Sequence, residues 1–203
     1  MPASSRSDAA HPVPDALIYI HGFNSSPASF KARVLREALV ARAPTAVFLA
    51  PALPHSPAAA ARLLEATVSA QPRALLVGSS LGGYYATRLA ERHGLRAVLV
   101  NPAVRPYELL AGHVGRQKNL YTGEEYEFTA AHVEELRALE VERVTPARYL
   151  LMATTGDEVL DYRRALERYR GAREYVVEGG DHGFGDFAQH LDALFAFAAF
   201  DPR

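Results

Sequence analysis

Short apolar runs alternate with longer stretches of helical periodicity along most of this chain. The short runs have the length and composition of strands buried in a parallel sheet. In the longer stretches apolar residues recur every three or four positions, which predicts amphipathic helices. The predicted strands cover residues 16–20, 46–49, 73–77, 97–100, 147–153 and 174–177, and the predicted helices follow Pro27 and then cover 57–70, 81–93, 130–139, 159–170 and 187–200.

This alternation predicts the α/β class, with one parallel sheet covered by helices on both faces in a three-layer αβα sandwich. We expect residues 1–14 to be a flexible tail and residues 15–203 to be a single domain. The alternation breaks at residues 104–146, which are too many for an ordinary crossover. A long irregular insertion at this place is either a lid over a site or a cover for one edge of the sheet.

Composition narrows the choice of function. The 203 residues are 49% hydrophobic, which suits one domain with a sizeable core. The net charge of −1 gives no basic surface for nucleic acid or anionic membranes. Without cysteine the chain has no disulfides, thiol catalysis or thiolate metal sites, a composition compatible with a cytoplasmic location. We expect no signal peptide and no membrane span, because no apolar run is long enough.

The strongest chemical signal is Gly78-Ser79-Ser80-Leu81-Gly82, which joins a predicted strand to a predicted helix. This is the G-x-S-x-G pattern of a nucleophile elbow, in which a sharp turn holds the serine hydroxyl above the sheet. The two outer positions need glycine because strand and helix approach closely there. The alternative is a glycine-rich turn that only packs. We expect Ser80 to be a nucleophile.

A serine nucleophile needs a base and an acid, which in this architecture follow it in the order serine, acid, histidine. Asp157 follows the predicted strand 147–153, and His182 follows the strand 174–177. We expect His182 to take the proton of Ser80 and Asp157 to orient the imidazole. Glu158 is an alternative acid, whereas Asp161 is better explained as a helix N-cap.

Two backbone N–H groups must stabilise the oxyanion that such a reaction forms. We expect one from Leu81, which follows the nucleophile at the start of a helix. The other should come from the loop after the first strand, with Phe23 as the first choice and Asn24 as the second. His21 lies in the same loop, where hydrogen bonding within the loop is a simpler role for it than catalysis.

Metal and nucleotide cofactors lack their usual signatures. The chain has neither an H-E-x-x-H nor a D-x-D-x-D-G pattern, and no G-x-G-x-x-G follows the first predicted strand. We therefore expect no metal and no cofactor.

Several stretches together resemble the α/β-hydrolase superfamily, and within it the YqiA-like family of small bacterial esterases. The resemblance implies a serine esterase or thioesterase without a cofactor, acting on small-molecule acyl esters or acyl-CoA. It also implies a compact sheet of six strands in the order 2-1-3-4-5-6, with Ser80, Asp157 and His182 in the catalytic positions. The similar stretches are IYIHGFNSSPASFKA (18–32), VGSSLGGYYATRLAE (77–91), LVNPAVRPYELL (99–110), YTGEEYEF (121–128), TGDEVLDY (155–162) and GGDHGF (179–184).

The function expected from these observations is cleavage of short- to medium-chain acyl esters or acyl-CoA thioesters through a Ser80 acyl-enzyme. A small peptidase or amidase of the same fold is the second hypothesis, and a non-catalytic binding module is the third. The oligomeric state is left open. Residues in the first loop and near the insertion are candidate substrate contacts, the basic ones for an anionic leaving group such as CoA: His21, Asn24, Arg105, Tyr107, Arg116 and Lys118.

Overall fold

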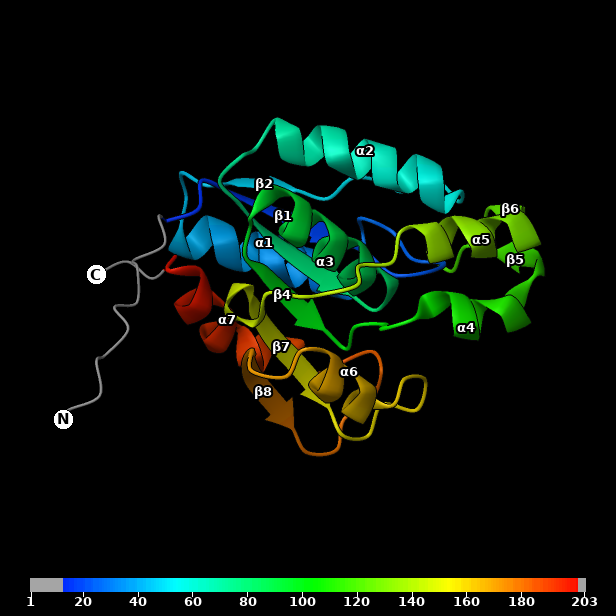
Figure 1. The fold of residues 1–203 in the computed structure, drawn as a ribbon. Coiled ribbons are helices and arrows are strands. Elements are labelled where there is room, and N and C mark those ends of the chain that lie inside the picture. The colour runs from blue at the N-terminus through cyan, green and yellow to red at the C-terminus, as the bar shows by residue number, and fades with distance from the viewer. Residues whose placement is uncertain (1–12, 201–203) are drawn as a thin grey trace.

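The computed structural model describes residues 13–200, so residues 1–12 of the predicted tail lie outside the described residues. Six parallel strands form the central sheet in the order β2-β1-β3-β4-β7-β8. Helices cover both faces (Figure 1). The predicted class, layers and strand order are confirmed. A small separate hairpin, β5–β6, comes before the last two strands of the sheet, so the fifth and sixth predicted strands are labelled β7 and β8.

The element boundaries follow the predicted pattern closely. The last predicted helix, 187–200, is shorter than expected: residues 187–190 form a 3₁₀ turn, and α7 begins after it. The strands are β1 Ala16–Ile20, β2 Val47–Leu49, β3 Ala74–Ser79, β4 Ala97–Val100, β5 Gly115–Lys118, β6 Glu125–Phe128, β7 Tyr149–Thr154 and β8 Arg173–Val177. The helices are α1 Phe30–Arg42, α2 Pro57–Ser69, α3 Leu81–His93, α4 Pro106–Leu110, α5 Ala130–Ala138, α6 Tyr162–Arg168 and α7 Leu191–Ala198.

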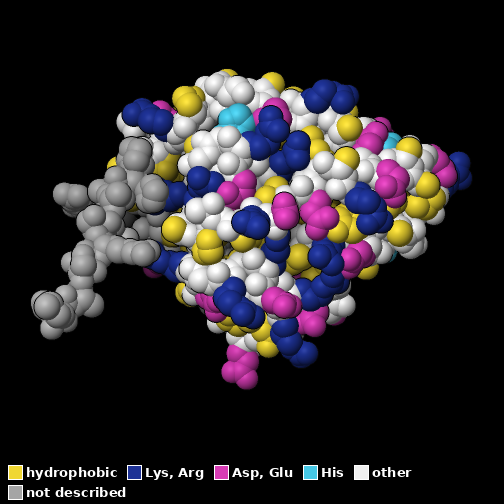
Figure 2. All heavy atoms as spheres, in the orientation of Figure 1, with side chains coloured by type: hydrophobic (Ala, Val, Ile, Leu, Met, Phe, Trp, Pro, Cys, Tyr) yellow, Lys and Arg dark blue, Asp and Glu magenta, His cyan; other side chains and the backbone are white. Residues whose placement is uncertain are grey.

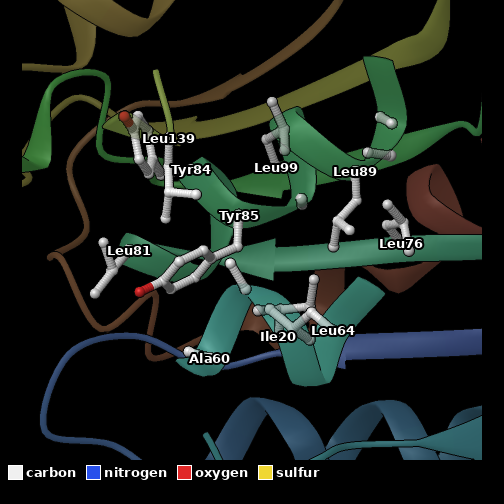
Figure 3. Packing of buried hydrophobic residues seen from close by; sticks show 14 of the residues in the cluster. Ile20, Ala60, Leu64, Leu76, Leu81, Tyr84, Tyr85, Leu89, Leu99 and Leu139 are labelled. Carbon is white, nitrogen blue, oxygen red and sulfur yellow. The ribbon is translucent and has the colours of Figure 1, made fainter. Parts of the chain in front are cut away.

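Alternate residues of the central strands pack into two separate core layers, as the two-residue period of a strand requires. In β1, Leu17 and Tyr19 belong to the layer under α1 and α7, whereas Ile18 and Ile20 belong to the layer under α2, α3 and α6. Figure 3 shows the second layer, in which Leu64, Leu76 and Leu89 contribute to one cluster. Strands β1, β3, β4 and β7 are buried throughout, which explains why their sequences are continuous apolar runs.

The insertion lies beyond the carboxyl ends of the strands, and consists of α4, the β5–β6 hairpin and α5 (Figure 1). The prediction of an irregular segment is wrong for residues 115–128, because these form the antiparallel hairpin. Its strands GRQK and EYEF are short and largely exposed, so they carry too little apolar alternation to be recognised. The insertion packs on the domain: Phe128 and Leu136 are fully buried, and Tyr84 Oη donates to Leu136 O at 2.8 Å.

The surface carries mixed charge on the face drawn in Figure 2, where basic and acidic side chains are interspersed over the helices. Among residues 13–200, no helix combines the length and the apolar character needed to cross a membrane.

Helix α3 begins in very close contact with the strands beneath it. A Cβ on Gly82 would lie 1.9 Å from the carbonyl oxygen of Ile20 in β1, and one on Gly78 would lie 2.4 Å from the carbonyl oxygen of Gly82. Real Cβ atoms do not approach backbone atoms so closely. Both glycines are therefore required by space alone.

Replacing Gly82 with valine should destabilise the protein severely, because α3 and β1 would have to move apart. We expect Gly82→Val to lower the unfolding free energy by more than about 3 kcal/mol, which is large for one substitution. Thermal unfolding followed by circular dichroism measures this. Gly112→Val is the matched control, since nothing lies within 4 Å of a Cβ at Gly112. Equal melting temperatures for the two variants would contradict the packing described here.

Candidate active site

Ser80 occupies the turn between β3 and α3 in a backbone conformation that residues with side chains rarely adopt. Its φ of 55° and ψ of −121° place it outside the ordinary regions. The surrounding backbone holds this conformation. Ser80 N–H donates to Val100 O at 3.0 Å, and Ser80 O accepts from the N–H groups of Gly83 and Ala103. Such strain persists where the neighbouring structure fixes it, which is common at functional sites.

Ser80, His182 and Asp157 form a continuous hydrogen-bonded row. His182 Nε2 lies 3.0 Å from Ser80 Oγ, and His182 Nδ1 lies 2.8 Å from Asp157 Oδ2. An ionised carboxylate can only accept, so Nδ1 carries the proton that it donates to Asp157. In the neutral imidazole Nε2 is then the acceptor, and the Ser80 hydroxyl donates to it. The predicted order along the chain brings these three side chains together from the ends of β3, β7 and β8.

Asp157 is fixed by its surroundings as well as by the histidine. The backbone N–H groups of Val159 and Leu160 both donate to Oδ1, at 2.9 and 2.8 Å. Burial favours the neutral acid, but the hydrogen bonds from His182 and these N–H groups outweigh it and hold the pKa of Asp157 below its ordinary value. The carboxylate is therefore ionised at neutral pH.

The alternative acids have other partners. Glu158 Oε2 accepts from the backbone N–H of His182 at 3.0 Å, so it holds the histidine loop and not the imidazole. Asp161 accepts from Arg163 N–H and is the N-cap of α6, as predicted.

The loop of residues 21–26 lies directly against the serine. A Cβ on Gly22 would be 3.2 Å from Ser80 Cβ and 3.6 Å from Ser80 Oγ. Within the described residues, the N–H groups of Phe23 and Leu81 donate to no protein acceptor. Phe23 lines the space in front of Ser80, whereas Leu81 directly follows Ser80 as the first residue of α3. Both N–H groups are therefore candidate donors to a negative charge that develops beside Ser80.

A cleft of about 440 Å³ opens in front of the serine. It is lined by Ser80 and His182, by the 21–26 loop and by an apolar rim that we define as Phe30, Leu120 and Tyr121. The rim residues come from α1 and from the turn of the hairpin, and Leu120 is 82% exposed. Large apolar side chains exposed together at the mouth of a cleft mark a surface that binds apolar groups.

Sequence reasoning missed Lys31, which also lines this cleft. Its Nζ donates to the carbonyl oxygen of Gly183, next to the histidine. Burial lowers the pKa of Lys31 to about 8, although the charges of Asp181 and Asp157 act in the opposite direction. The residue lies in the stretch SFKA, and only the fold brings it to the histidine loop, some 150 residues further along the chain.

Asn101 was also missed, although it directly follows β4 at the edge of the sheet where the site lies. Its side-chain N–H₂ donates to Thr154 Oγ1 and to the carbonyl oxygens of Asp181 and His182, at 3.1 to 3.2 Å. Its Oδ1 accepts from Thr154 N–H at 2.9 Å. The position of a polar residue at the carboxyl end of an inner strand was the available signal. Asn101 joins the strand next to Ser80 to the loop that carries the base.

The predicted substrate contacts divide into two groups. His21 and Asn24 lie in the loop beside the serine: His21 Nδ1 lies 3.0 Å from Gly22 O, and His21 Nε2 accepts from Leu53 N–H at 3.3 Å.

In contrast, the other four predicted contacts do not line the Ser80 cleft: Arg105, Tyr107, Arg116 and Lys118. Tyr107 donates to Glu140 and Arg105 pairs with Glu108 and Glu140, while Arg116 faces Glu125. Among the described residues that line the cleft, Lys31 is the one lysine, and none is an arginine.

Candidate metal ligands do not gather elsewhere in the described part of the chain. Within residues 13–200 no three His, Cys, Asp or Glu side chains are close enough together to hold a metal ion.

The chain matches a known protein family over most of its length. The model of the uncharacterised protein family UPF0227 matches residues 16–199. The UPF0227 protein YcfP of Salmonella arizonae is 28% identical over 187 residues, covering 89% of this chain and 97% of YcfP.

Two solved structures have the same architecture. The mouse alpha/beta hydrolase domain-containing protein 10 superposes with a TM-score of 0.66 and 17% identity, covering 89% of each chain. A monoacylglycerol lipase from Paleococcus ferrophilus superposes with a TM-score of 0.67 and 15% identity, covering 93% of this chain and 96% of the lipase. At these identities the likeness establishes the fold alone, which is the predicted α/β-hydrolase fold.

The lowered pKa of Asp157 predicts how the stability conferred by this carboxylate depends on pH. Because the folded-state pKa lies below the unfolded one, the contribution is present at neutral pH and is lost as the pH falls through the folded pKa. Urea unfolding of wild type and Asp157→Asn between about pH 5 and about pH 2 tests this. The difference in unfolding free energy should shrink as the pH falls, and a constant difference would contradict the assignment.

Proposed function

The chain belongs to the UPF0227 family, and we propose that it is a serine hydrolase that cleaves short- to medium-chain acyl esters or acyl-CoA thioesters. The observation that carries the proposal is the hydrogen-bonded row of Ser80, His182 and Asp157, placed at a strained elbow that faces an open cleft. A hydroxyl, an imidazole and a buried carboxylate in this order are the parts needed to make serine nucleophilic at neutral pH.

Acylation starts with attack of Ser80 Oγ on the carbonyl carbon of the substrate. His182 Nε2 removes the hydroxyl proton as the new C–O bond forms, and Asp157 stabilises the imidazolium that results. The tetrahedral intermediate then collapses, its bond to the leaving group breaks, and His182 returns the proton to the departing alcohol or thiol. The product of this half-reaction is the Ser80 acyl ester.

The negative oxygen of the intermediate needs donors that are already in position. The Leu81 N–H at the start of α3 and the Phe23 N–H from the 21–26 loop are the proposed pair. Leu81 has the additional advantage of the helix N-terminus, where the partial positive charge favours an anion. Asn24 remains the alternative to Phe23.

Deacylation repeats the sequence with water. His182 removes a proton from a water molecule, whose oxygen attacks the acyl carbon, and the proton is then returned to Ser80 Oγ as the acid leaves. Apart from the water that deacylation consumes, every group used in this proposed cycle belongs to the chain or to the substrate.

The apolar rim favours a substrate that carries an acyl chain. Phe30, Leu120 and Tyr121 are exposed at the mouth of the cleft, where a chain attached to the reacting carbonyl could lie against them. A monoacylglycerol lipase has the same fold, so an ester substrate is compatible with it. Among the described residues that line the cleft, Lys31 is the one lysine or arginine side chain. The several phosphates of a CoA thioester would therefore need further basic contacts outside the cleft.

Turnover of a p-nitrophenyl acyl ester tests the proposal. We expect activity in the wild type, a loss of about 10⁶-fold in kcat for Ser80→Ala, and a loss of about 10⁴-fold for Asp157→Asn. An alanine p-nitroanilide measured beside the ester separates an esterase from a peptidase or amidase. Turnover of the anilide alone would favour the peptidase or amidase, and a folded protein without either activity would favour the binding module.

If the acyl chain lies against the apolar rim, kcat/KM should be higher for long acyl chains than for short ones. Substituting one rim residue should weaken this preference. Leu120→Ser should lower kcat/KM for the octanoyl ester roughly 10-fold, because the chain loses apolar contact, and leave the acetyl ester unchanged. Leu63→Ser is the control, since Leu63 is an exposed leucine on α2, away from the cleft. Equal losses for both esters would place the acyl chain elsewhere.

A further inference from the structure

The loop that carries the Phe23 N–H is held from outside by the insertion. This loop connects β1 to α1, and Asn24 within it adopts a left-handed conformation with φ of 53°. The distance from Phe23 N–H to a developing oxyanion depends on where this loop lies, and a misplacement of about 1 Å can cost a factor of roughly 100 in rate. The contacts that fix Asn24 therefore matter for catalysis.

Asn24 is bound through all of its polar side-chain atoms and through its carbonyl. Its Nδ2 donates to Gln117 Oε1 at 3.1 Å, and its Oδ1 accepts from Tyr126 Oη at 2.7 Å. Its carbonyl oxygen accepts from Leu120 N–H at 3.0 Å. All three partners belong to the β5–β6 hairpin or its turn, about 100 residues away in sequence.

Neighbouring residues of the loop make further contacts with the same hairpin. Ser25 O accepts from Asn119 Nδ2 at 2.9 Å. The ring of Phe23 packs edge-on against Phe128, with their centroids 5.2 Å apart. The hairpin thus contacts three consecutive residues of the loop.

The hairpin is itself fixed to the body of the domain. The Tyr126 ring stacks on His55 at 3.6 Å between centroids and 8° between planes. Phe128 is fully buried, and Asn119 Oδ1 accepts from the N–H groups of Tyr121 and Thr122 and so closes the hairpin turn. An element held this way on both sides has the contacts of a structural support and not those of a lid that swings open.

We propose that the β5–β6 hairpin is a fixed clamp that positions the Phe23 N–H for catalysis, with Asn24 and Tyr126 as positioning residues. This inference rests on the proposed function, since it assigns the hairpin a part in the same oxyanion stabilisation. It also replaces both expectations for the insertion, a moving lid and a passive cover, for residues 115–128. In this proposal the side chain of Asn24 holds the loop.

The test is a comparison of steady-state kinetics with the p-nitrophenyl ester. Tyr126→Phe removes the hydroxyl that donates to Asn24 and keeps the ring that stacks on His55. We expect kcat to fall about 10-fold while KM stays within about two-fold, since the loss concerns the transition state. Tyr175→Phe is the control, because it removes a tyrosine hydrogen bond to His190 elsewhere in the fold; it should leave both parameters unchanged.

A double substitution shows whether Tyr126 acts through Asn24. Asn24→Gly removes the side chain and tolerates the left-handed backbone, so it should lower kcat at least as much as Tyr126→Phe. Adding Tyr126→Phe to Asn24→Gly should then cause no further loss, as expected for two groups that share one bond. Losses that multiply would overturn the assignment. Gln117→Leu, at the hairpin surface, provides a second variant if Tyr126→Phe does not fold.

The two proposals fail in different ways. A folded wild type without ester turnover would contradict the proposed function. A wild type that is active, together with unchanged kcat in Tyr126→Phe and in Gln117→Leu, would overturn the clamp and leave the proposed function standing.

Discussion

The contact between the start of α3 and the backbone of β1 and β3 determines the geometry of the site. With no side chain at Gly82, the helix approaches the Ile20 carbonyl oxygen so closely that a Cβ would lie 1.9 Å from it. This approach forces the strained turn at Ser80 and places the hydroxyl above the sheet, next to the 21–26 loop. The nucleophile and the proposed Leu81 donor thus depend on this one packing constraint, whereas the loop of the proposed Phe23 donor is also held by the hairpin. Strain at Ser80 persists because hydrogen bonds from β4 and α3 hold its backbone on both sides.

Around this constraint, the ends of the inner strands supply the remaining chemistry. Asp157 follows β7 and is fixed by two N–H groups, while His182 follows β8 and is held by Glu158 through its backbone and by Asn101 through its carbonyl. The row of hydrogen bonds needs each loop to be in place, because a shift in any one of them breaks the path from hydroxyl to carboxylate. Rigid parallel strands are well suited to such positioning, since their carboxyl ends meet at one edge.

The sheet and the positions of the serine, acid and histidine were predictable because they follow from local patterns. Continuous apolar runs predict buried parallel strands, and the glycines around Ser80 mark the elbow directly. The roles of Lys31 and Tyr126 were not predictable, because each binds a residue more than 100 positions away that only the fold brings close. Asn101 did carry a signal, its place at the end of β4, but its partners in the histidine loop were not readable from the sequence. The hairpin was missed for a related reason. Its strands are short and largely exposed, so their sequences show little of the apolar alternation that identifies a strand.

Intact-protein mass spectrometry after treatment with a fluorophosphonate shows whether Ser80 is an activated nucleophile, since this reagent reacts with serines activated by a neighbouring base. We expect a single adduct on the wild type and no adduct on Ser80→Ala, with both proteins equally folded by circular dichroism. No adduct on the folded wild type, or the same adduct on Ser80→Ala, would contradict this expectation.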